Sequence, residues 1–81
     1  MISTNYTVGS GSNQMIMRGG CDTGYYVSGS TILKGGCYTD LSVNNGGKIL
    51  KNGSETGYFI SGGSIMKDDY DKGYNIDWLF N

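Results

Sequence analysis

Apolar residues recur along the chain in short patches, separated by runs of glycine, asparagine and serine. From residue 15 to residue 79 the patches repeat with a period of 16 residues, interrupted by one extra residue, Gly47. The four units are residues 15–30, 31–46, 48–63 and 64–79, and a shorter, degenerate copy stands before them at residues 5–12. A fixed period of this kind is typical of repeat architectures, in which each unit forms one supersecondary element.

Two apolar patches lie within each unit. The first carries an isoleucine, then Met or Leu, then a basic residue, as at residues 16–18 and 32–34. The second alternates with period two, as a half-buried strand does, and places Tyr or Leu and then Val or Ile on its inward face. The outward positions of this second patch are Tyr26, Ser42, Phe59 and Asn75. Each unit therefore predicts two short strands.

These strands predict an all-β fold, a short β-solenoid of about four 16-residue coils. We interpret the glycine-rich pairs between strands as the corners of a coil, because they tolerate positive backbone angles. Coils stacked about 4.8 Å apart would bury the apolar residues that one unit cannot bury alone. Residues 1–81 then form one domain, with an N-terminal cap and degenerate coil at 1–14, four repeats at 15–79 and an overlapping C-terminal cap at 75–81. Trp78 and Phe80 of the C-terminal cap would cover the open core.

Composition narrows the fold class and the compartment. The chain has 81 residues, 15 of them Gly, with no Pro, no His and a net charge of −1. So much glycine argues against a helical bundle, since each interior Gly costs a helix about 1 kcal/mol relative to Ala. The glycines keep no three-residue period, which excludes collagen. Because the chain shows no signal peptide and no apolar run of roughly 18 residues, we expect a cytoplasmic protein, within a host cell, with no membrane contact.

Residues that carry chemistry are few. Neither Cys21 nor Cys37 has a partner in the sequence that would act as its base, and no nucleophile elbow, P-loop or Rossmann fingerprint occurs. We therefore expect no enzyme activity, no metal site and no cofactor. The two cysteines share one column of the repeat, which leaves free thiols or a disulfide open, with free thiols favoured in a reducing cytosol. With pI near 4.9 and six scattered basic residues, direct nucleic-acid binding is not expected.

Aromatic and basic positions supply the candidate partner-binding residues. Tyr26 and Phe59 would project outward from the strand face, where rigid aromatic side chains suit a binding hot spot, or would pack against a terminal segment. Tyr38 interrupts an acidic column of the repeat. A basic column would either keep the surface soluble or steer a protein partner towards it. The candidates in this column are Lys34, Lys51 and Lys67.

The apolar column that follows the isoleucines leaves two alternatives. Its members are Met17, Leu33, Leu50 and Met66. Two adjacent apolar columns cannot both point inward along one regular strand, so either a corner turns between them or one column faces outward. An outward column would suit a homodimer or a target interface.

The corner segments carry a resemblance to a known family. They read Val27-Ser28-Gly29-Ser30, Val43-Asn44-Asn45-Gly46-Gly47 and Ile60-Ser61-Gly62-Gly63. Over residues 15–67 the chain resembles the passenger repeats of AIDA-type autotransporter adhesins, which implies a β-solenoid. It is shorter than those adhesins and has a non-secretory start. In size and layout alone it is more like the small inhibitors of phages and mobile elements, anti-CRISPR proteins among them.

The predicted function is a non-catalytic protein-binding module. We expect it to act by surface occlusion, as a phage or mobile-element inhibitor of a host defence nuclease, with a protein target as its partner. The alternative is a structural or adhesive surface repeat segment, which would be exported and would stack end to end. A monomeric or dimeric state would favour the first, and polymerisation the second.

Overall fold

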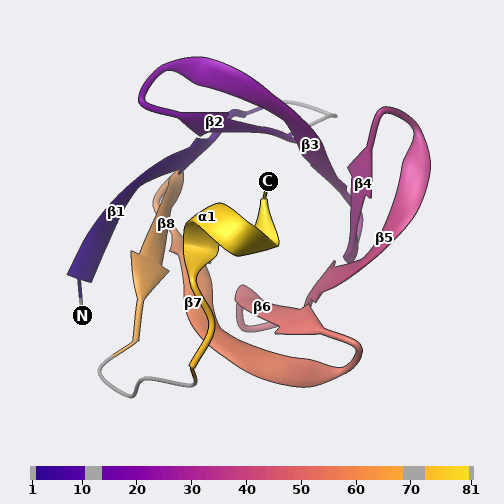
Figure 1. Cartoon of the computed structure of the whole chain (residues 1–81), viewed down its shortest axis with the longest axis vertical. Helices are drawn as coiled ribbons and strands as arrows, with labels where there is room; N and C mark the ends of the chain where they lie inside the picture. The colour runs from indigo at the N-terminus through magenta and orange to yellow at the C-terminus, as the bar shows by residue number, and fades with distance from the viewer. Residues whose placement is uncertain (1, 11–13, 69–72, 81) are drawn as a thin grey trace.

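The computed structural model describes residues 2–10, 14–68 and 73–80. Within these ranges eight β-strands form a closed barrel, with one short helix at the end of the chain (Figure 1). The elements are β1 (Ile2–Val8), β2 (Gln14–Arg18), β3 (Cys21–Ser28), β4 (Thr31–Lys34), β5 (Cys37–Val43), β6 (Lys48–Lys51), β7 (Ser54–Ser61), β8 (Ser64–Lys67) and α1 (Ile76–Leu79). The all-β prediction is confirmed. The β-solenoid prediction is wrong.

The turns between strands explain why the units do not coil. Each strand pairs antiparallel with the next, and β8 pairs antiparallel with β1 to close the ring. At Gly19-Gly20 both residues have positive φ, 55° and 86°, and Asn52-Gly53 has the same geometry at 52° and 82°. Two-residue turns of this kind reverse the chain into a hairpin whose twist matches its strands. A solenoid corner bends the chain without reversing it, so the pairs that we interpreted as corners are hairpin turns.

The barrel consists of four pairs of strands, and each pair has one short strand and one longer strand. In the last pair the short strand is β8, and the long strand is β1 from the other end of the chain. The amide of Val8 donates to the carbonyl of Gly63 at 2.8 Å, and the equivalent amides of Val43 and Ile60 make the same bond at 2.8 and 2.7 Å. Residues 1–14, expected as a cap, thus contribute a barrel strand in their described part.

The inward faces of the strands meet in one core. Four isoleucines, one from each short strand, have no exposed surface, and they are Ile16, Ile32, Ile49 and Ile65. A second buried ring comes from the long strands and consists of Tyr6, Tyr25, Leu41 and Tyr58. The inward position predicted for Tyr25, Leu41 and Tyr58 is confirmed, and the isoleucine column, whose direction the sequence left open, faces inward too. Burial of each such side chain contributes about 1.5–3 kcal/mol.

A threonine on each long strand bonds to the short strand beside it. Its hydroxyl donates to an isoleucine carbonyl at 2.6 to 2.7 Å and accepts from the amide two residues later at 3.1 to 3.4 Å. The four residues are Thr4, Thr23, Thr39 and Thr56, and we call them the bridging threonines. The strand register shifts near each of them, as at a β-bulge. Such irregularities bend strands, as closure of a small barrel requires.

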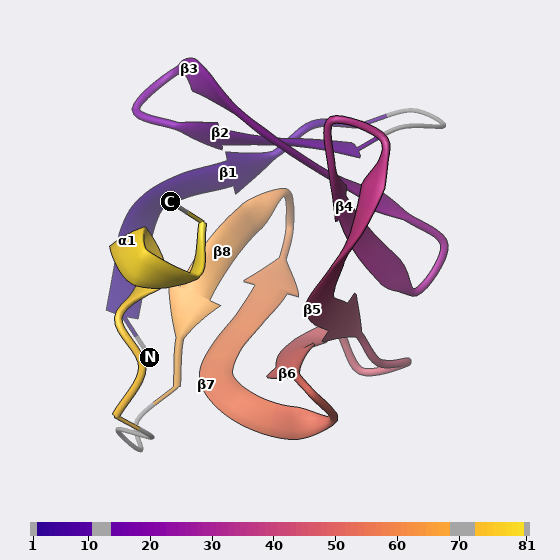
Figure 2. The same cartoon turned by 45° about the vertical axis from the view of Figure 1, so that its right-hand side comes forward.

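Helix α1 covers one end of the barrel. In Figure 1 helix α1 lies inside the ring of strands, and in the turned view of Figure 2 it lies close to β1. Leu79 and Phe80 are buried, whereas Trp78 is 59% exposed. The C-terminal cap predicted for residues 75–81 therefore covers the core in its described part, through Phe80 and Leu79 rather than through Trp78.

In the described residues of the fourth unit no long strand follows β8, although the sequence predicts one. Lys72 lies outside the described residues, Gly73 to Asn75 form no strand, and α1 begins at Ile76. The place of that strand is taken by β1. Among the described residues no helix has both the length and the apolar character needed to cross a bilayer.

Candidate binding site at the barrel mouth

The end of the barrel that α1 covers, which we call the mouth, is rimmed by the basic column of the repeat. Each basic residue lies directly across from a member of the buried tyrosine and leucine ring, as Tyr25 does from Lys34 and Leu41 from Lys51. Arg18 and Lys67 lie in the same way opposite Tyr6 and Tyr58. Directly opposed residues share a face of the sheet. The predicted column is therefore a ring around the mouth and not a stripe along a rod.

The cations of this ring contact different partners. The Nε of Arg18 lies 3.3 Å from an oxygen of Asp77 on α1. The Nζ of Lys34 lies 5.0 Å from the centre of the Tyr25 ring. The Nζ of Lys51 lies 3.7 Å from a carboxylate oxygen of Asp40 and 4.9 Å from the centre of the Trp78 ring. Two cations on different strands thus contact α1.

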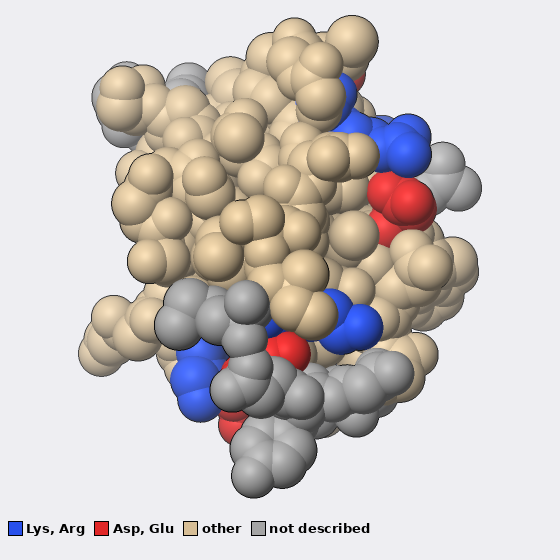
Figure 3. All heavy atoms as spheres, turned by 90° about the vertical axis from the view of Figure 1, so that its left-hand side faces the viewer, with Lys and Arg blue, Asp and Glu red and all other residues tan. Residues whose placement is uncertain are grey.

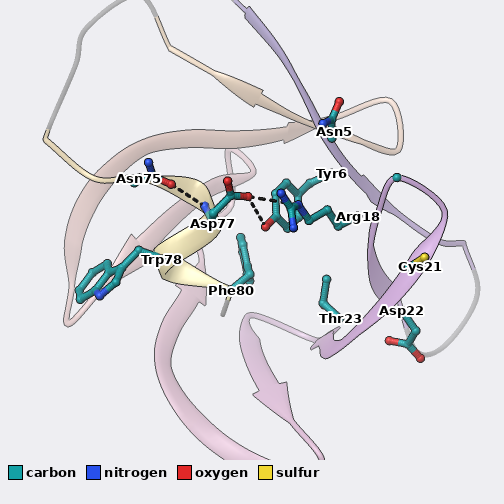
Figure 4. Close-up of a pocket in the computed structure, with 11 residues that line it drawn as sticks. Asn5, Tyr6, Arg18, Cys21, Asp22, Thr23, Asn75, Asp77, Trp78 and Phe80 are labelled. Carbon is teal, nitrogen blue, oxygen red and sulfur yellow. Dashed lines mark hydrogen bonds and ion pairs between the residues drawn. The ribbon is translucent and has the colours of Figure 1, made fainter.

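Asp77 links α1 to β1 as well as to β2. The hydroxyl of Tyr6 donates to the same Asp77 oxygen at 2.8 Å (Figure 4). Burial and the hydrogen bond to the Asp77 carboxylate, of which burial is the larger cause, together raise the pKa of Tyr6 to about 12. The backbone amide of Asp77 donates to the side chain of Asn75, which caps the helix. Hydrogen bonds therefore hold both the backbone and the side chain of Asp77.

Aromatic side chains of the barrel core pack against the residues that follow α1. The Phe80 ring lies 5.5 Å from that of Tyr6 and 5.3 Å from that of Tyr25, the second in an edge-on arrangement. The hydroxyl of Tyr58 donates to the carbonyl of Tyr74 at 3.2 Å. These contacts tie three members of the buried ring to the C-terminal segment. A site built on α1 is therefore held by the barrel and does not depend on the helix alone.

Two hollows flank α1. The larger, of about 980 Å³, lies between α1 and the hairpin of β2 and β3, with Arg18, Cys21, Asp22 and Asp77 among its lining residues (Figure 4). Its carboxylates already have internal partners, because Asp77 binds Tyr6 and Arg18, and Asp22 accepts the amide of Gly24. This arrangement explains how the helix is held and offers little unused polar chemistry.

The smaller hollow, of about 500 Å³, lies on the other side of α1, and we call it the Trp78 hollow. It is lined by Tyr25, Tyr38, Thr39, Asp40, Leu41, Lys51, Trp78 and Leu79. Tyr38 is 81% exposed and Trp78 is 59% exposed, and no other aromatic side chain of the described residues is exposed to this degree. In Figure 4, Trp78 points away from Asp77 and Phe80. Both exposed aromatic side chains thus border one concave surface that also holds the charged pair of Lys51 and Asp40.

The structure brings some of the predicted binding residues together. Tyr38 and Lys51 line the Trp78 hollow, and Lys34 lies over Tyr25, which lines it too. Tyr26 is half-buried on the outer wall of β3, opposite Leu33, and Leu33 is opposite Tyr38 on its other side.

Phe59 and Lys67 lie elsewhere. Phe59 is on β7, four strands from the β3 strand of Tyr26 in either direction around the ring, so these two aromatic residues do not share a surface. On the outer wall Phe59 lies opposite Met66. The outward alternative for the Met and Leu column is thereby the correct one. Figure 3 shows the side of the barrel that carries β1, where charged groups gather along the edges and the rest of the wall is uncharged.

Sequence reasoning assigned Trp78 to the cap that covers the core and missed Asp40. A signal for Trp78 existed in the short segment after Asn75. If this segment is helical, Ile76, Leu79 and Phe80 share one face because they are three and four residues apart, and Trp78 falls outside that face. The contribution of Asp40 has no local signal, since its partner Lys51 comes from another hairpin.

Two further kinds of chemistry concern metal ions and the cysteine thiols. Over residues 2–10, 14–68 and 73–80 there is no group of three or more potential ligands that could hold a metal ion. Cys21 and Cys37 are exposed free thiols at the first positions of β3 and β5. Of the two alternatives for the cysteines, the structure has the free thiols.

Comparison of the chain with protein-family models, with curated proteins and with solved structures gave no match. The resemblance to AIDA-type adhesin repeats is therefore wrong, because the segments that carried it form hairpins of a closed barrel. The likeness to anti-CRISPR proteins rested on the layout of a short solenoid, and it is wrong as well, because the chain forms a closed barrel.

Proposed function

We propose that this protein is a non-catalytic protein-binding module that contacts its partner through the Trp78 hollow. The observation that carries the proposal is the placement of Tyr38 and Trp78, the two exposed aromatic side chains of the described residues, on the border of one hollow. Tyr and Trp are enriched in binding hot spots because each buries a large apolar surface and fixes few rotatable bonds.

The Trp78 ring is held in place before a partner arrives. It stacks on the Tyr74 ring with a centroid distance of 6.4 Å, and the Nζ of Lys51 contacts it. A partner that binds here would therefore immobilise little of the Trp78 side chain, which lowers the entropy cost of association. The Lys51 and Asp40 pair adds polar groups beside the apolar surface, and such groups favour specificity.

Strand closure limits the ways in which a partner can bind. All the described strands have a neighbour on each side, so an extended peptide finds no free edge to lengthen the sheet. Side chains must therefore make the contact. A folded partner that inserts one apolar side chain between Tyr38 and Trp78, with a polar group near Asp40 or Lys51, fits this surface.

Some finer expectations from the sequence remain predictions. These are the inhibition of a host defence nuclease, the origin in a phage or mobile element, the cytoplasmic location and a homodimer. End-to-end stacking of a surface repeat is not carried further, because it needed the open coil ends of a solenoid.

Site-specific photo-cross-linking tests the proposal. A photoreactive phenylalanine analogue at position 38 should give one discrete cross-linked product in extract of the host cell, and the product should disappear when Trp78→Ala is added. The same analogue at position 59, on the outer wall of β7 and outside the lining of the hollow, serves as the matched control and should give no such product. A product of equal yield at position 59, or one that Trp78→Ala leaves unchanged, would remove the hollow from the binding site. Mass spectrometry of the product separates a foreign partner from a second copy of this chain.

A further inference from the structure

Residues 73–76, which come after β8, have the sequence of a long barrel strand, although they are not part of the sheet. Gly73-Tyr74-Asn75-Ile76 aligns with Gly57-Tyr58-Phe59-Ile60 of β7. The backbone agrees at the glycine, since φ is 83° at Gly73 and 86° at Gly57. Only glycine adopts this conformation without strain, and Gly24 of β3 shares it at 87°, so the segment has kept a feature of β3 and β7.

The position that this segment would take in the barrel is occupied by β1. By the 16-residue period, the segment would follow β8 through a hairpin and place Tyr74 and Ile76 inward. In the structure Tyr6 and Val8 of β1 stand at those two inward positions, between β8 and β2. One place in the barrel therefore has two matching sequences, one from each end of the chain.

The turn after β8 disfavours the C-terminal copy. The three equivalent hairpin turns have Gly-Gly or Asn-Gly with positive φ at both residues, whereas here the sequence reads Asp68-Asp69. Two consecutive aspartates tolerate this backbone poorly. The amide of Asp68 still donates to the carbonyl of Gly57 at 2.6 Å, as the amide of Gly35 does to Gly24 at 3.2 Å. The barrel geometry thus continues as far as the turn.

The bridging threonine is the second difference. In β1, Thr4 donates to the carbonyl of Ile65 at 2.6 Å and accepts the amide of Tyr6. At the equivalent position the C-terminal copy has Lys72, whose ammonium group can donate a hydrogen bond but cannot accept one. The Thr4 side chain therefore bonds to both neighbouring backbone groups, whereas a lysine in that position could bond only to the carbonyl.

From these observations we infer that residues 73–76 belong to an alternative closing strand, which pairs with β8 and β2 when β1 leaves its place. In the exchanged form Tyr74 replaces Tyr6, Ile76 replaces Val8, α1 unfolds and the mouth opens. The wild-type sequence keeps β1 in place through its bridging threonine and through the packing of Leu79 and Phe80. A factor that binds β1 shifts the balance by its preference for the exchanged form. The barrel then stays closed while the mouth is uncovered.

Cysteine bridging in the full chain tests the exchange. Both native cysteines are first replaced by Cys21→Ser and Cys37→Ser. Ser64→Cys with Thr7→Cys reports the structure described here, in which Thr7 and Ser64 are opposed. Ser64→Cys with Asn75→Cys reports the exchanged form, because Asn75 stands in the same column of the repeat as Thr7.

A redesigned turn and bridge should shift the balance towards exchange. Asp68→Asn, Asp69→Gly and Lys72→Thr give the C-terminal copy the features that it lacks. We expect these substitutions to accelerate the bridge between positions 64 and 75 at least tenfold, and hydrogen exchange should show amides 73–76 gaining protection while amides 2–8 lose it.

A matched variant isolates the hydroxyl group. Lys72→Val has the shape of Lys72→Thr without the hydroxyl and should accelerate the bridge less. Equal rates for the two would refute the part assigned to the bridging threonine. The inference as a whole is overturned if the redesigned chain forms only the bridge between positions 64 and 7, or if amides 2–8 and 73–76 both lose protection.

Discussion

At the scale of single residues, the bridging threonines supply hydrogen bonds at the positions where the regular backbone pairing of the sheet is interrupted. Where the register shifts, a strand leaves a backbone donor and an acceptor out of line with the neighbouring strand. The hydroxyl of Thr56 satisfies both, since it donates to Ile49 at 2.7 Å and accepts from Tyr58 at 3.4 Å. Thr56 is 1% exposed, so water cannot replace it. The same chemistry recurs at all four bulges.

Thr56→Val should lower the free energy of unfolding by about 1–3 kcal/mol, because it leaves buried polar groups without their partner at nearly constant volume. Thr7→Val is the control, since Thr7 is an exposed residue of β1 with no such bond, and it should change stability by less than about 0.5 kcal/mol. Urea denaturation followed by circular dichroism measures both. Equal losses in the two variants would contradict the role given to the buried hydroxyl.

Tyr6 makes stability depend on alkaline pH. Its pKa is about 12 in the folded protein against an ordinary 10.0, so the unfolded chain releases this proton first. Stability from this group is fully present below pH 10 and should fall between pH 10 and pH 12, by at most about 1.4 kcal/mol per pH unit. Denaturation at several alkaline pH values should show a shallower fall for Tyr6→Phe than for the wild-type chain. Parallel curves would contradict the raised pKa.

At the scale of elements, α1 acts as the cover of the barrel and as one wall of the Trp78 hollow. Its two roles fall on different side chains. Phe80 is 4% exposed and packs on two tyrosines of the core, whereas Trp78 is 59% exposed and faces the hollow. A four-residue helix has little stability of its own, so its position comes from these tertiary contacts.

Phe80→Ala should destabilise the protein by about 3–5 kcal/mol, the usual cost of removing a buried aromatic ring. Trp78→Ala should cost about 1 kcal/mol or less, because its ring is already largely in water. If Phe80→Ala is too unstable to study, Phe80→Leu should give an intermediate loss. Thermal unfolding compares the variants, and a larger loss for Trp78→Ala than for Phe80→Ala would show that the cover is assigned to the wrong residue.

At the scale of the whole molecule, closure is the property that separates this fold from the predicted one. A solenoid has two open ends where a further chain can add, and a closed ring of strands has none. The described part of the chain measures 30 × 25 × 23 Å along its principal axes, which is nearly isometric. The strand pairing of β1 with β8 therefore removes the route to long assemblies.

Light scattering after size exclusion should give a mass that stays at one or two copies of 8.7 kDa as the protein concentration rises. The physical reason is that the barrel offers no unpaired strand edge within its described residues. Growth of the mass without limit, with a rise in β-sheet signal, would contradict a closed barrel and would return the stacking alternative to consideration.

The sequence by itself determined the β class, the 16-residue repeat and the inward columns, because these depend on alternation and period, which are local. It also contained the hairpin signals, in pairs such as Asn52-Gly53, but an interpretation as corners and one as turns predict the same burial for Ile49 and Tyr58. Of the candidate site, the sequence supplied Tyr38 and Lys51. It did not supply Trp78, which was expected to cover the core as part of the C-terminal cap.

Only the tertiary structure decided how the repeat closes and which residues meet. The pairing of β1 with β8 joins residues more than sixty positions apart, as the bond from Thr4 to Ile65 shows. Whether such distant strands meet depends on the sum of turn geometry and bulges around the ring, and no single segment contains that sum. The Trp78 hollow has the same origin, because Tyr38 and Trp78 become neighbours only once the last residues fold back over the mouth of the closed barrel.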